Sequence, residues 1–181
     1  MSIKHIRINI DDLEKKRCKS VSAFLRPILH NKQIPATFFA ASSDDIRIIT
    51  LNEIQNRELR EIRFRIPNSD FKGMYYEIWR KIDRKNFELE KMYFHLFNSE
   101  NEEYLLLHCD PNDADLTHGN YKRSPHLHIE QTPETIIKKA HLALNVTNYD
   151  AIFENIDALT QAFAEHILMI KSQILDSKKS K

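Results

Sequence analysis

The chain has 181 residues, 41% of them hydrophobic, with 27 Lys and Arg against 26 Asp and Glu. A chain of this length buries enough apolar surface to fold as one domain without disulfides or a structural metal. The near-neutral charge excludes a general attraction to nucleic acid or membrane. Only two glycines are present, which argues against dinucleotide-binding and P-loop folds, because both need clustered glycines. With two distant cysteines, no signal-like start and no long apolar run, we expect a cytoplasmic protein that does not enter the membrane.

The N-terminal third predicts one helix followed by short strands. Apolar residues recur every three or four positions over residues 11–30, with Asp11 or Asp12 as the cap, and Pro27 should end this helix. Apolar and basic residues alternate over residues 61–66, which predicts a half-buried strand with a basic outer face. Shorter strands are expected at residues 37–39 and 46–51.

The middle of the chain is typical of an antiparallel meander, because three apolar segments are joined by short polar connections. The apolar phase of the second segment shifts between Leu89 and Met92, which predicts a β-bulge. A long loop, residues 110–124, separates the meander from a last strand. The predicted strands cover residues 74–82, 87–97, 104–109 and 125–130.

The C-terminal third is predicted to be helical. Thr132, Pro133 and Glu134 form a typical helix start, and that helix should run to about residue 144. A second amphipathic helix is expected over residues 148–176.

These elements predict an α+β fold. Its antiparallel meander sheet should have five or six strands, an N-terminal helix and a C-terminal helical pair. Residues 1–145 would form one α+β domain. Residues 146–181 would form a long helix with a basic tail, packed on the sheet or, through residues 149–175, on a homodimer or protein partner.

The candidate site lies in the last predicted strand and the loop before it. If residues 125–130 are a strand, His126, His128 and Glu130 project from one face, while Leu127 and Ile129 face the core. His108 ends the preceding strand and could join them, and the loop adds His118, Lys122 and Arg123. A His-x-His pair alone also fits an ordinary polar strand face.

Two chemistries fit these residues. In the first, His126 and His128 act as acid and base on a phosphodiester, most simply RNA, while Lys122 and Arg123 stabilise the charged phosphate and His118 or His108 assists. In the second, His126 and His128, together with Glu130 or His108, bind one divalent metal ion. The cofactor expectation is therefore none, or one divalent metal.

Other features give weaker hypotheses. Arginines at positions 57, 60, 63 and 65 could form a nucleic-acid-binding stripe, or simply a solvated strand face. Cys109 follows His108 directly, so the two side chains point to opposite faces and a catalytic cysteine is not expected. His141 and His166 were expected within helices, as packing or surface residues. The arginines of the proposed stripe are Arg57, Arg60, Arg63 and Arg65.

The order of a meander, a loop with basic residues and a histidine-rich strand resembles small toxin proteins of bacterial toxin–antitoxin pairs, such as the TumE-like group. The resemblance covers the middle third of the chain and implies a toxin or defence protein with nuclease activity. No residue role is transferred from it. The lack of a strong catalytic motif leaves a non-catalytic subunit of a bacterial complex, binding protein or nucleic acid, as the alternative.

Overall fold

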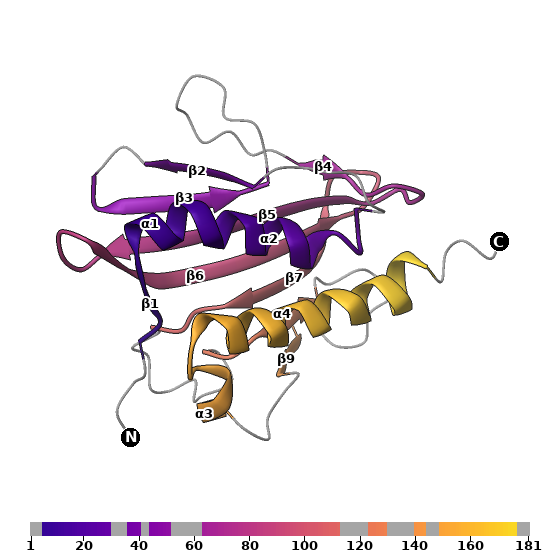
Figure 1. The fold of residues 1–181 in the computed structure, drawn as a ribbon. Coiled ribbons are helices and arrows are strands. Elements are labelled where there is room, and N and C mark those ends of the chain that lie inside the picture. The colour runs from indigo at the N-terminus through magenta and orange to yellow at the C-terminus, as the bar shows by residue number, and fades with distance from the viewer. Residues whose placement is uncertain are drawn as a thin grey trace.

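The fold is one antiparallel sheet with an N-terminal helical segment and a C-terminal helix on the same face (Figure 1). The predicted α+β class, antiparallel sheet and terminal helices are confirmed. None of the helices in the described part of the chain is long and apolar enough to cross a bilayer. The computed structural model describes residues 5–29, 36–40, 44–51, 63–112, 123–129, 140–143 and 149–176.

Within those residues, the sheet order is β2-β3-β5-β6-β7-β8-β9, and two short strands flank it, β1 beside β6 and β4 beside β5. Every pairing is antiparallel, and the strands from β5 to β9 follow one another as a meander; the connections β5–β6 and β6–β7 are short, which favours antiparallel neighbours. The strands are β1 (Arg7–Asn9), β2 (Thr37–Ala40), β3 (Ile46–Thr50), β4 (Phe64–Arg65), β5 (Lys72–Lys81), β6 (Asn86–Phe97), β7 (Glu103–Cys109), β8 (His126–Ile129) and β9 (Ala140–Ala143).

Side-chain alternation divides the two faces of the central strands. Tyr75, Glu77 and Trp79 of β5 are fully buried toward the helices, whereas Tyr76 lies on the opposite face, called the open face here because no described helix packs on it. The predicted bulge is present in β6, where the register with β5 shifts between Ile78 and Trp79. Leu89 before the bulge and Met92 after it are therefore both buried.

The N-terminal helical segment comprises α1 (Ile10–Asp12), a π-helical turn η1 (Leu13–Arg17) and α2 (Cys18–Leu25). Its cap is Asn9 rather than Asp11 or Asp12, because the Asn9 side chain accepts a hydrogen bond from the Asp11 backbone N–H. The helix ends at Leu25, two residues before Pro27, as predicted.

The C-terminal third corrects two predictions. Residues 140–143 form β9, paired with β8, instead of the end of a helix, so His141 lies in a strand. The helix expected over 148–176 is broken into α3 (Tyr149–Ile152), α4 (Ile156–Ile170) and a π-helical turn η3 (Lys171–Leu175), because Asn155 caps α4 with hydrogen bonds from two backbone N–H groups. The apolar stripe of α4 belongs to the same buried core as the sheet, so this helix packs on its own chain.

A buried ion pair joins the helices to the sheet. The Glu77 carboxylate accepts hydrogen bonds from the Arg17 guanidinium at 2.6–3.1 Å, from the Tyr75 hydroxyl and from Trp79 Nε1 at 2.8 Å. Arg17 Nη1 also donates to Thr160 Oγ1 of α4. Each of the two buried charges therefore has an opposite charge and hydrogen-bond partners, without which its burial would be costly.

Candidate metal centre

Strand register brings three histidines together on the open face. His108 in β7 is the direct partner of His126 in β8, so their side chains share a face. His128 follows His126 by two residues and therefore projects from that face too. The convergence of His108 with the His-x-His strand, which the sequence left undecided, is thus present; we call these three residues the triad.

The three imidazoles have the spacing that one metal ion needs. Their ligand nitrogens lie within 4.8 Å of one another, and Nε2 of His108 lies 2.5 Å from Nε2 of His128. A zinc ion with bonds of about 2.0–2.1 Å would hold tetrahedral nitrogens roughly 3.4 Å apart, so the Nε2 atoms of His108 and His128 would move apart by about 1 Å to bind it. His126 is fully buried and His108 is only 7% exposed.

Two partners fix which imidazole nitrogen is available. Nδ1 of His126 lies 2.8 Å from the carbonyl oxygen of Ser124, and Nδ1 of His108 lies 3.1 Å from a carboxylate oxygen of Asp110. Both partners can only accept hydrogen bonds, so each Nδ1 carries the proton and each Nε2 keeps a lone pair. The short contact between the Nε2 atoms of His108 and His128 is a place where a metal ion could bind instead. Outer partners of this kind are characteristic of metal-binding histidines.

Asp110 is itself held in place. The Tyr93 hydroxyl donates to its other carboxylate oxygen at 3.2 Å. Burial alone would raise the pKa of Asp110, but the hydrogen bond and charge of His108, with Lys91 and Tyr93, lower it from its usual value. Burial, reinforced by the charge of Asp110, raises the pKa of Tyr93 well above its ordinary value. Asp110 is thus an anion next to the triad, and Tyr93 donates a hydrogen bond to it.

The triad ends a row of stacked rings that crosses the open face. Tyr76 stacks on Tyr93 at 5.0 Å between ring centroids, and Tyr93 stacks on His108 at 5.1 Å. His95 continues the row toward Phe97, whose ring is covered by the Arg63 guanidinium at 3.7 Å. Ring faces that are turned to neighbouring rings are not available for the stacking of nucleobases.

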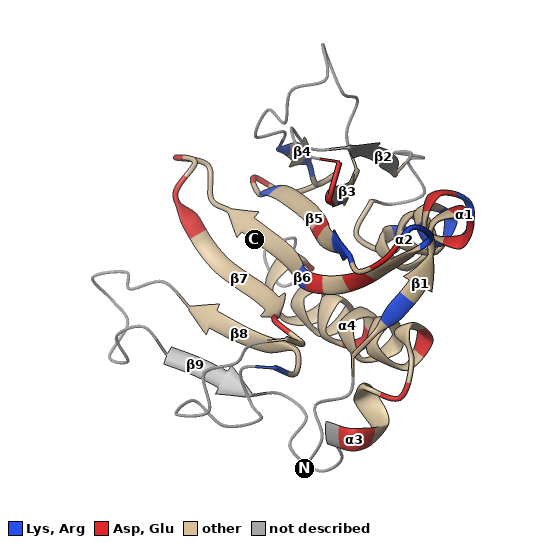
Figure 2. Cartoon of the chain, turned by 90° about the vertical axis from the view of Figure 1, so that its left-hand side faces the viewer, with Lys and Arg blue, Asp and Glu red and all other residues tan. Residues whose placement is uncertain are grey.

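The strands that contribute the triad carry almost no formal charge. Figure 2 shows β8 without any Lys, Arg, Asp or Glu, and Glu103 is the one such residue in β7. The Glu103 carboxylate is engaged by His95, 2.5 Å away. Asp110, one residue beyond β7, is therefore the carboxylate that the described residues place against the triad.

The other predicted site residues are distributed differently. The Arg123 guanidinium donates to the Pro111 carbonyl and lies over the Phe153 ring, and none of its contacts within the described residues is with the triad. Arg63 covers Phe97, and Arg65 lies across from Lys72 in the β4–β5 pairing. Several predicted residues lie outside the described residues: Arg57, Arg60, His118, Lys122 and Glu130.

Cys109 is a core residue rather than a nucleophile. Its side chain is fully buried on the helix side, and its thiol donates to the Arg123 carbonyl oxygen. Burial raises the pKa of Cys109 well above its usual value. The argument from strand alternation thus places His108 and Cys109 correctly on opposite faces.

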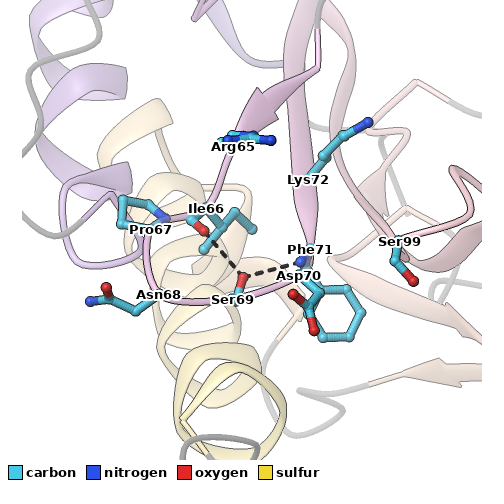
Figure 3. A pocket seen from close by; sticks show the side chains of 9 residues that line it. All are labelled: Arg65, Ile66, Pro67, Asn68, Ser69, Asp70, Phe71, Lys72 and Ser99. Atoms are coloured by element: carbon cyan, nitrogen blue, oxygen red, sulfur yellow. Dashed lines mark hydrogen bonds between the residues drawn. The ribbon is translucent and has the colours of Figure 1, made fainter.

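Two hollows on the surface are lined largely by polar residues. One, of about 670 Å³, surrounds the β4–β5 turn, where the Ser69 hydroxyl bridges the Ile66 carbonyl and the Phe71 N–H (Figure 3). Arg65 and Lys72 extend side by side from neighbouring strands there. The other, of about 400 Å³, is lined by Asp110 together with Arg80, Glu90, Lys91 and Asn112.

Sequence reasoning did not single out Tyr93, which donates to Asp110, or Lys91 and Arg80, which line the hollow beside it. Their positions depend on the bulge and on the pairing of β5, β6 and β7, which a single strand's pattern does not give. In the sequence Asp110 was one of several acids in the long loop; its position two residues after His108 was the available signal.

The chain was compared with protein-family models, with curated proteins and with solved structures. No family model, no curated protein and no solved structure matches it. Its candidate site is therefore defined by its own geometry.

Proposed function

We propose that this protein is a metal-dependent enzyme in which His108, His126 and His128 bind one divalent transition-metal ion. The convergence of the three imidazole nitrogens within 4.8 Å carries the proposal. Imidazole is a good ligand for zinc, copper, iron and nickel, and three protein ligands leave a coordination position for water or substrate. A bound ion of this kind polarises its ligand and lowers the pKa of a bound water, the usual basis of metal-assisted hydrolysis.

The surrounding residues have defined roles in this proposal. Asp110 lies 3.1 Å from Nδ1 of His108 and, as an acceptor, favours the tautomer of that ring whose Nε2 lone pair faces the ion. Ser124 does the same for His126 through its carbonyl oxygen. Tyr93 holds Asp110 from the other side. The chain thus prepares its ligands before the ion arrives.

Metal content tests the proposal directly. The untagged protein is incubated with excess zinc, freed of unbound metal and analysed by plasma mass spectrometry. We expect one zinc per chain in the wild type and almost none in His128→Gln. The matched control is His95→Gln, on the same face but outside the triad, and it should retain the metal. Absence of zinc from the incubated wild type, or equal zinc content in His128→Gln, would contradict the proposal.

Metal-free cleavage of RNA by histidine acid–base chemistry is the second candidate. The Asp110–His108 pair favours it, because a carboxylate that orients an imidazole makes that imidazole a better base. The 2.5 Å distance between the Nε2 atoms of His108 and His128 disfavours it, since a phosphate bridging these atoms would have to part them further than a metal ion would. Incubation with mixed RNA distinguishes the two: cleavage that survives EDTA supports acid–base catalysis, and cleavage that EDTA abolishes supports the metal centre.

A further inference from the structure

The hollow beside the triad has the size of a small-ligand site. We call it the Lys91 pocket; its volume is about 400 Å³, and typical ligand pockets measure about 300–1,000 Å³. Asp110 belongs to the pocket wall and also touches His108, so the pocket adjoins the triad. Its five lining residues are all polar or charged: Arg80, Glu90, Lys91, Asp110 and Asn112.

Most of the polar groups in this wall are already engaged. Arg80 and Glu90 form an ion pair with each other. Asp110 receives hydrogen bonds from Tyr93 and faces His108. The Asn112 amide donates to a Glu88 carboxylate oxygen at 2.8 Å and to a backbone carbonyl. These groups therefore have little capacity left to recognise a ligand.

Lys91 differs from its neighbours in the wall. It is exposed, and within the described residues its ammonium takes part in neither an ion pair nor a hydrogen bond. The bulge in β6 places it on the open face, with its ammonium 5.9 Å from the centroid of the Tyr93 ring. It is thus an available cation in a pocket next to the triad.

We infer that the Lys91 pocket binds the oxyanion of the substrate, a phosphate or carboxylate group, with Lys91 as its counter-ion. This inference rests on the proposed function, because it names the substrate class of the same centre. With a metal ion bound to the triad, the negative charge of Asp110 would be balanced by that ion. The positive charge of Lys91 would then be available to the substrate. A lysine ammonium makes charge-assisted hydrogen bonds to such oxygens. All five lining residues are polar or charged, which suits a ligand that carries a charged group.

Calorimetric titration with inorganic phosphate tests this assignment, and acetate serves as the carboxylate arm. The wild type is compared with Lys91→Met and with a control, Lys85→Met, which removes an equally exposed lysine from the β5–β6 turn outside the pocket. We expect Lys91→Met to weaken phosphate or acetate binding roughly tenfold or more, the effect of one hydrogen bond to a charged group. Lys85→Met should bind as the wild type does, and zinc content should be unchanged in both variants. The stronger of the two anions identifies the group.

The same titrations on EDTA-treated protein separate this inference from the proposed function. Binding that persists without metal and falls in Lys91→Met supports the pocket even if the triad binds no ion. Binding that requires metal and is equal in wild type and Lys91→Met places the anion on the ion itself. That result, or no binding of either anion, overturns the assignment to Lys91 and leaves the metal proposal intact.

Discussion

The buried Arg17–Glu77 pair allows the most quantitative test of the fold. Glu77→Gln keeps the shape of the side chain but replaces one carboxylate oxygen with an NH₂ group. Glu77 Oε2 accepts from Trp79 Nε1 at 2.8 Å and Oε1 accepts from Arg17 Nη2 at 2.6 Å. Whichever oxygen is lost, a buried donor then faces another donor, which costs about 1–3 kcal/mol. The Arg17 charge, only 2% exposed, also loses its counter-ion, and breaking such a buried pair costs about 3–5 kcal/mol in all.

Urea unfolding measures this cost. Trp79 is the single tryptophan of the chain and is fully buried against Glu77, so its fluorescence follows the transition. The control is Glu90→Gln, which breaks the partly exposed Arg80–Glu90 pair on the same sheet and should cost no more than about 1 kcal/mol. A free energy of unfolding for Glu77→Gln that falls no further than that of Glu90→Gln would refute the reasoning.

Three other predictions concern the site, the sheet and the response to pH. Asp110→Ala should weaken zinc binding about 10- to 100-fold, measured against a competing chelator; an unchanged affinity would remove Asp110 from the site. Gly73→Ala should cost about 1–3 kcal/mol of stability, because a Cβ there would lie 2.7 Å from two ring carbons of Phe64; unchanged urea unfolding would show that Phe64 can move. Burial lowers the pKa of His166, so the unfolded chain binds that proton more tightly, and stability should fall as the pH drops below about 6.5. The fall should be smaller in His166→Gln than in the wild type, and equal slopes in urea titrations would contradict the assignment.

Much of the fold could be predicted because periodicity is a local signal. The meander strands, the bulge between Leu89 and Met92, and the two faces of residues 126–129 all follow from alternation within a few residues. The class of the fold and the end of the first helix near Pro27 follow in the same way.

The errors arise where distant partners decide the local structure. Residues 140–143 include good helix formers, yet their pairing with β8 makes them a strand. The break before α4 had a local signal, since Asn155 is a strong capping residue, but the continuous apolar stripe concealed it. Two of the three histidines of the triad could be predicted from the alternation of side chains within one strand. His-x-His is visible in one strand, whereas the contribution of His108 depends on the β7–β8 register.

The extra residue in β6 decides which face of the sheet is able to do chemistry. Up to Leu89 the odd-numbered side chains point toward the helices, and from Lys91 onward they point away from them. Without that one residue, Tyr93 would sit among the helices, and Met92 would stand beside the triad. Side chains alternate between the two faces of the sheet. Removal of two residues here would therefore leave the later side chains of β6 on the same faces, whereas removal of one would exchange the faces. Deletion of one residue here should therefore impair folding as well as function, because it turns Met92, Phe94 and Leu96 out of the core and places apolar side chains beside the triad.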